Sequence, residues 1–95
     1  MTGMLEKKGR LKKSWKKRFF VLLNNYIFYF TKEKGGQLKG FLRIEECEIE
    51  REEGAKGSVF NVKTLGRLLS LRAEDTETRE EWIKWIYENS RMLHE

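Results

Sequence analysis

Short apolar stretches recur along the chain as far as residue 73, and each is too short to form a helix. They are rich in aromatic and β-branched residues, which is typical of strands. Turn-forming residues separate them, as at Asn24-Asn25, Gly35-Gly36 and Gly66. The pattern predicts about seven strands over residues 2–73. The stretches are Met4-Leu5, Phe19 to Leu23, Tyr26 to Phe30, Phe41 to Ile44, Val59 to Val62 and Leu68 to Leu71.

The C-terminal part of the chain has a different pattern, which predicts one amphipathic helix over residues 76–91. Asp75 or Thr76 can cap its N-terminus, and acidic residues follow in the first turns, where the helix dipole favours them. We expect both helix tryptophans to lie in the core. A mainly β fold with one C-terminal helix closing the sheet at one end follows from this order of elements. The apolar residues of the helix are Trp82, Ile83, Trp85, Ile86 and Leu93.

Length and composition indicate one globular domain over residues 1–95. Hydrophobic residues make up 39% of the chain and charged residues 37%, so a packed core is expected. No apolar run approaches the roughly 18 residues that a membrane span needs, so any membrane contact would be peripheral. Cys47 is the single cysteine, which excludes an internal disulfide and favours an intracellular setting.

Positive charge is concentrated at the start of the chain. Residues 1–18 carry eight basic side chains and one acidic side chain, a net charge of +7. The remaining residues have a net charge of −2, since the whole chain has 20 Lys and Arg and 15 Asp and Glu. Such a local excess indicates an anionic binding partner.

Strand alternation predicts where the basic side chains of this segment point. Lys7 shares a face with Leu5, while Lys16 and Arg18 share a face with Phe20. In an antiparallel meander, each interior face would change from apolar to polar at the same end. Arg, Lys and Tyr together suit a phosphate, because Arg offers a planar fork, Lys a mobile charge and Tyr a neutral donor. The side chains expected to converge at one open mouth are Lys7, Lys16, Arg18 and Tyr29.

The order of these motifs resembles the pleckstrin-homology (PH) family over essentially the whole chain. The resemblance implies a seven-stranded antiparallel PH-like β-sandwich or partly open barrel capped by an amphipathic α-helix. It also implies membership of the phosphoinositide-binding subset, which carries Lys, a variable gap, Lys or Arg, any residue, and Arg. The residues that carry the resemblance are Gly3 to Lys7, Ser14 to Leu22, Ile27 to Phe30, Lys39 to Leu42, Phe60 to Val62, Leu69 to Ala73 and Glu81-Trp82-Ile83.

The same resemblance implies roles for individual residues. Lys7 and Arg18 would contact phosphates at the 3- and 4-positions of inositol, and Lys16 would lie beside them. Tyr29 would donate to a phosphate, and Lys39 would be a further phosphate ligand. A contact from the basic loop to the inositol ring would come from Lys13. The predicted headgroup-binding residues are Lys7, Lys13, Lys16, Arg18, Tyr29 and Lys39.

These residues favour a 3-phosphorylated inositol lipid as the ligand. Some members of the family add a hairpin between the sixth and seventh strands that contacts the 5-phosphate. Here that turn is only Thr64-Leu65-Gly66-Arg67. The resemblance therefore leaves both the 3,4,5-trisphosphate and the 3,4-bisphosphate open.

The loop after the first strand is the predicted membrane-contact loop, at Arg10, Leu11 and Lys12. Each basic residue near an anionic membrane contributes on the order of 1 kcal/mol. For Leu11 two interpretations are open: a packed or harmlessly exposed loop residue, or a residue that inserts into lipid. Insertion would contribute roughly 1.5–3 kcal/mol if the side chain became fully buried.

Other classes of function fit the sequence less well. There is no Gly-rich nucleotide loop, no metal-ligand spacing and no nucleophile with a base, so we expect no enzyme, no cofactor and no metal. Nucleic acid is disfavoured because the positive charge is confined to one segment. The alternative is a protein-interaction module with only generic attraction to membranes. The expected location is cytoplasmic, with peripheral recruitment to a membrane. The plasma membrane is the membrane that we expect.

Overall fold

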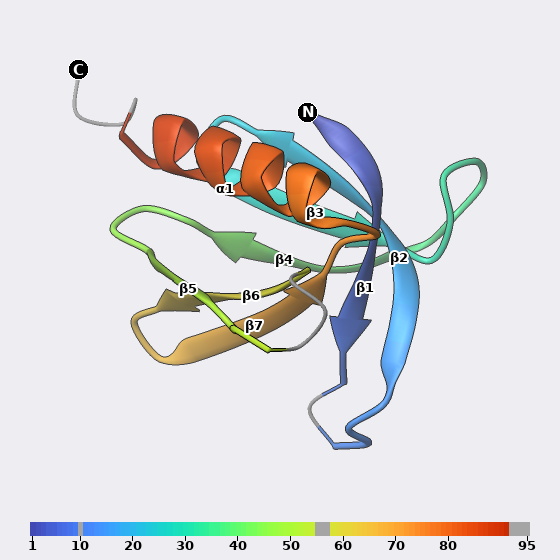
Figure 1. Cartoon of the computed structure of the whole chain (residues 1–95). Coiled ribbons are helices and arrows are strands. Elements are labelled where there is room, and N and C mark those ends of the chain that lie inside the picture. Colours follow the sequence, from blue (N-terminus) through green and yellow to red (C-terminus); the bar gives the residue numbers. More distant parts are fainter. Residues whose placement is uncertain (10, 55–57, 92–95) are drawn as a thin grey trace.

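The computed structural model describes residues 1–9, 11–54 and 58–91, which form seven strands followed by one helix (Figure 1). Predicted residues Arg10 and Leu93 lie outside these ranges. The helix occupies the predicted residues, and six of the seven strands overlap the six predicted apolar stretches, whereas β5 corresponds to none of them. The elements are β1 (Thr2–Lys8), β2 (Trp15–Leu23), β3 (Tyr26–Phe30), β4 (Leu38–Arg43), β5 (Glu48–Arg51), β6 (Val59–Thr64), β7 (Arg67–Arg72) and α1 (Thr76–Arg91).

The strands form one antiparallel sheet in the order β4-β3-β2-β1-β7-β6-β5. Strand β1 pairs with β2 along its whole length but with β7 through only two residue pairs, Glu6 with Arg72 and Lys7 with Leu71. The end strands β4 and β5 are not paired with each other among the described residues, so the sheet is not closed. This confirms the predicted mainly antiparallel fold with a single C-terminal helix.

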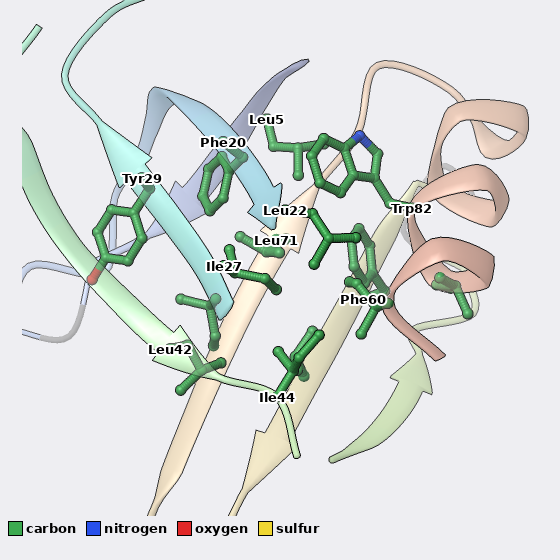
Figure 2. Close-up of a cluster of buried hydrophobic side chains, with 14 of the residues drawn as sticks. Leu5, Phe20, Leu22, Ile27, Tyr29, Leu42, Ile44, Phe60, Leu71 and Trp82 are labelled. Atoms are coloured by element: carbon green, nitrogen blue, oxygen red, sulfur yellow. The ribbon is translucent and has the colours of Figure 1, made fainter. Parts of the chain in front are cut away.

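The sheet bends around one core, which the helix also covers. Phe20 from β2, Ile27 from β3 and Phe60 from β6 are completely buried in the same cluster as Trp82 of α1 (Figure 2). Strands from both halves of the sheet thus contribute to one cluster. Fully burying a side chain of this size stabilises the fold by roughly 1.5–3 kcal/mol. The core therefore fixes the positions of the strand ends that carry Lys7, Lys16 and Arg18.

Helix α1 begins where the sequence predicts. The carboxylate of Asp75 accepts a hydrogen bond from the Thr78 backbone N–H at 2.7 Å, which is the N-cap arrangement. Hydrogen bonding from Thr78, first through its side chain and then through its backbone N–H, lowers the pKa of Asp75. Trp82 is buried, as predicted, but the prediction for Trp85 is wrong, since 43% of its surface is exposed. The buried stripe runs through Trp82, Ile83 and Ile86, and Trp85 lies about 100° from its centre at helical spacing.

Candidate anion-binding site

The β1–β2 hairpin separates its charges by face. On the outer face Glu6 lies opposite Lys17, an attractive pair, whereas on the inner face Lys7 lies directly opposite Lys16. Like charges directly across an antiparallel pair destabilise the sheet. The inner pair therefore carries a repulsion that a bound anion would relieve.

A hollow of about 770 Å³ opens where this inner face emerges from the core. Five of the residues around it are cationic, and no acidic residue lines it among the residues that the structure describes. Its charge is therefore entirely positive. The residues around the hollow are Lys7, Gly9, Leu11, Lys12, Lys16, Arg18, Tyr29 and Lys39.

Among the residues that the structure describes, the cations of the hollow form no ion pair with an acidic residue. Elsewhere, basic side chains form ion pairs, such as Arg51 with Glu80 at 2.7 Å. In residues 1–9, 11–54 and 58–91, no carboxylate lies within 4.0 Å of any cation of the hollow. Arg18 donates from Nη1 to the neighbouring Lys17 carbonyl, at 2.9 Å. The hollow therefore has several charge-bearing donors free to bind an anion.

Tyr29 forms the inner wall of the hollow. Its ring stacks on Phe20 with centroids 5.5 Å apart, and the Lys7 ammonium lies 5.3 Å from the ring centroid. The side chain is only 6% exposed. Figure 2 shows the hydroxyl at the edge of the core, pointing away from the other labelled side chains. A buried ring with its oxygen at the edge of the core is a rigidly placed polar group.

Lys39 reaches the hollow because of an irregularity in β4. The register shifts between Tyr29 and Phe30, so that Tyr29 pairs with Gly40 and Phe30 with Leu38. Lys39 is thus the extra residue of a bulge, which can re-aim a side chain. Simple alternation would have placed Lys39 on the outer face with Phe41. Only the bulge brings it beside Tyr29.

The structure brings five of the six predicted headgroup-binding residues together: Lys7, Lys16, Arg18, Tyr29 and Lys39. The sixth, Lys13, is exposed and is not among the residues that line the hollow. Loop residue Lys12 takes that place instead. The reason is the loop's backbone, in which the Ser14 N–H bonds the Lys12 carbonyl at 2.7 Å and reverses the chain.

Leu11 projects from the loop and is 98% exposed, which excludes a packed role in this structure.

Arg67 contacts a residue of the hollow, and the sequence did not predict this contact. Its Nη2 donates to the Tyr29 hydroxyl at 2.8 Å, although the two residues are 38 positions apart. The only signal for it in the sequence is its place in the short turn between two strands.

A second hollow, of about 490 Å³, lies between β1 and the start of α1. Its charges are mixed, and the Glu6 carboxylate there accepts hydrogen bonds from Arg72. These bonds lower the pKa of Glu6. Arg72 also stacks on Trp15, with its guanidinium carbon 4.4 Å from the ring centroid. The paired charges give this hollow no comparable excess of free cations.

No helix in the described part of the chain is long and apolar enough to cross a membrane. The same residues contain no group of three or more His, Cys, Asp and Glu side chains that could hold a metal ion.

Comparison with protein families gives a match to the PH domain over residues 1–91. The zebrafish "Differentially expressed in FDCP 6 homolog" is 34% identical over 96 residues, which cover 98% of this chain. Mouse Switch-associated protein 70 is 32% identical over 94 residues, which cover 96% of this chain. The chain spans only 16% of the length of each of these relatives.

Similar folds are found among solved structures. The carboxyl-terminal PH domain of pleckstrin superposes with a TM-score of 0.86 at 28% identity, and the match covers 96% of both chains. The same pleckstrin domain in complex with D-myo-Ins(1,2,3,5,6)P5 gives a TM-score of 0.88 at 28% identity, covering 96% of this chain and 94% of that chain.

Proposed function

Since this chain belongs to the PH domain family, we propose that it binds the phosphorylated headgroups of inositol lipids in the hollow at the end of the β1–β2 hairpin. The family is a non-catalytic binding module, and we propose no reaction for this chain. The observation that carries the proposal is the cluster of five cations without an acidic residue around one hollow. The similar C-terminal PH domain of pleckstrin, whose crystal structure is of a complex with D-myo-Ins(1,2,3,5,6)P5, supports the same ligand chemistry.

The geometry of the hollow suits a ligand that carries several phosphates. Arg18 offers a planar fork for bidentate bonds to one phosphate, and Lys7 and Lys16 are opposed across the hairpin, where they can share another. Tyr29 and Lys39 provide donors from the neighbouring strands. Hydrogen bonds to charged groups contribute about 1.5–3 kcal/mol each, so a few of them suffice for specific binding.

The preferred ligand that we propose is a 3-phosphorylated inositol lipid, the 3,4-bisphosphate or the 3,4,5-trisphosphate. The joint presence of Lys7, Arg18, Tyr29 and Lys39 supports this preference. Arg10, Leu11 and Lys12 would then meet the lipid surface, with Lys13 adding charge from the same loop. Binding of this kind would recruit the domain to the cytoplasmic face of the plasma membrane.

Calorimetric titration at physiological salt tests the proposal. Soluble headgroups of phosphatidylinositol 3,4,5-trisphosphate, 3,4-bisphosphate and 4,5-bisphosphate are titrated into the wild type and into Arg18→Ala. We expect one-to-one binding that discriminates the isomers and a loss of at least about tenfold in affinity for Arg18→Ala, because a bidentate charge-assisted contact is removed.

Arg43→Ala is the matched control. It removes the same charge from an exposed arginine that pairs with Glu45 at 2.6 Å and does not line the hollow. Binding that depends only on phosphate number, with equal losses in the two variants, would indicate a generic electrostatic anchor and would contradict a stereospecific site.

A further inference from the structure

Arg67 of β7 links the two halves of the sheet through bonds to β3 and β4. It begins β7, after a tight turn in which Gly66 has a φ of 84°. Its Nη1 donates to the Phe41 carbonyl of β4 at 2.8 Å, while its Nη2 donates to the Tyr29 hydroxyl of β3 at the same distance. The planar guanidinium thus bonds two neighbouring strands through two separate nitrogens.

The Tyr29 hydroxyl has little freedom in this arrangement. On one side Arg67 donates to it, and on another the backbone of Gly40 approaches so closely that a Cβ at this position would overlap the hydroxyl. Because the hydroxyl oxygen already accepts from Arg67, its own proton is directed elsewhere. Tyr29 lines the hollow, and its hydroxyl points outward from the edge of the core (Figure 2), where a bound ligand could accept this proton.

The third nitrogen of Arg67 carries a cost. Its Nε is buried and has no hydrogen-bond partner among the described residues. A buried unsatisfied donor destabilises a fold, and an apolar side chain of similar size would avoid this penalty. This penalty offsets part of the stability that the bonds donated by Nη1 and Nη2 contribute.

From these contacts we infer that Arg67 is a positioning residue for headgroup binding: it holds the Tyr29 hydroxyl with its proton toward the hollow, as a donor to a phosphate oxygen. This inference rests on the proposed function. Arg67 acts through Tyr29 and does not contact the ligand. A hydroxyl that accepts from a cation is also polarised, which strengthens the bond that it donates.

A double-mutant cycle on the intact chain tests the inference. Affinity for soluble D-myo-inositol 1,3,4,5-tetrakisphosphate is measured for the wild type, Arg67→Lys, Tyr29→Phe and the double variant. Lysine keeps the charge but has no fork to bond both Phe41 and Tyr29. We expect each single change to lower the affinity about tenfold and the double variant to lose no more than either one, because both remove the same donated bond.

The salt dependence of binding distinguishes a positioning role of Arg67 from a purely electrostatic effect of its charge. Arg67→Lys should weaken binding while leaving the slope of affinity against salt unchanged, because the charge remains. Urea unfolding of each variant shows whether the measured protein is folded. If Arg67→Lys does not fold, Tyr29→Phe with Arg67 intact still decides the matter, since it removes only the proposed donor.

The possible outcomes are distinct. Tetrakisphosphate binding by Arg67→Lys or Tyr29→Phe within about twofold of wild type, or losses that simply add in the double variant, would overturn the inference. Failure of the wild type to bind the tetrakisphosphate or either of the bisphosphate headgroups would overturn the proposed function itself, and with it this inference.

Discussion

At the scale of single residues, the β1–β2 hairpin carries a stabilising charge pair on one face and a destabilising charge pair on the other. Glu6 faces Lys17 on the outer surface, and Lys7 faces Lys16 on the inner surface. The first pair supports the fold, whereas the second opposes it in the absence of an anion. Residues held against their own stability in this manner are typical of binding sites.

Lys16→Gln should therefore stabilise the free protein while weakening headgroup binding. Relief of the cross-strand repulsion is expected to raise the free energy of unfolding by about 0.2–1 kcal/mol. Affinity for an inositol phosphate should fall about tenfold through the lost charge-assisted bond. Urea unfolding at low and high salt, together with calorimetry, measures both effects.

Lys17→Gln is the matched control, since it removes the same charge from the adjacent position on the outer face. It should lower the free energy of unfolding slightly, because Glu6 loses a favourable neighbour. If both variants changed stability in the same direction, the opposition of charges across the hairpin would not be the cause.

At the scale of elements, an ion pair fastens β5 to the helix. Arg51 of β5 donates to both carboxylate oxygens of Glu80 in α1, at 2.7–3.0 Å. Glu80 also accepts from the Nε of Arg79, whose side chain is buried. Strand β5 is the end of the open sheet, so this contact compensates for the neighbour that it lacks on one side.

The Arg51–Glu80 pair predicts a specific dependence of stability on pH. Hydrogen bonding from Arg51 lowers the pKa of Glu80 below 4.5. A lowered pKa contributes stability that is present above the unfolded value and is lost as the pH falls through the folded value. Glu80→Gln should reduce the free energy of unfolding by about 1 kcal/mol at pH 7, a value that allows for partial exposure of the pair.

This difference from wild type should shrink as the pH is lowered below 4.5, where Glu80 itself becomes protonated. Urea unfolding at a series of pH values measures it. Glu81→Gln, on an exposed neighbouring position without an ion pair in the described structure, should have little effect at any pH. A difference that persisted unchanged in acid would mean that charge is not involved.

At the scale of the whole molecule, charge and exposed apolar surface meet at the β1–β2 hairpin, which projects beyond the other strands (Figure 1). The hollow holds the cations, and Leu11 on the adjoining loop is 98% exposed. The acidic residues of β5 lie in the other half of the sheet. An anionic surface would therefore attract one end of the domain and orient it.

Leu11→Ala tests whether this end enters lipid. Binding to phosphatidylcholine vesicles that contain phosphatidylinositol 3,4-bisphosphate should weaken about tenfold, because less apolar surface is removed from water. Affinity for the soluble headgroup should fall much less. The two assays are co-sedimentation and calorimetry, and equal losses in both would contradict insertion of Leu11.

The sequence by itself determined the helix, six of the seven strands and the faces of the strands around the hollow; the largely charged β5 gave no apolar signal. Alternation is a local property of extended backbone, so Lys7, Lys16 and Arg18 were assignable to the inner face from their apolar neighbours. The helix was equally predictable, because its cap at Asp75 and its apolar spacing are local signals.

Only the tertiary structure decided which side chains complete the site. Lys39 depends on a bulge, Lys13 is excluded by the path of its loop, and Arg67 reaches Tyr29 across 38 positions of the chain. Trp85 was wrongly predicted to be buried. Helical spacing shows which residues share a face of the helix, but it does not show how wide the buried stripe is. These features follow from how the sheet bends around its core. That bend is set jointly by many side chains, and no local stretch of sequence encodes it.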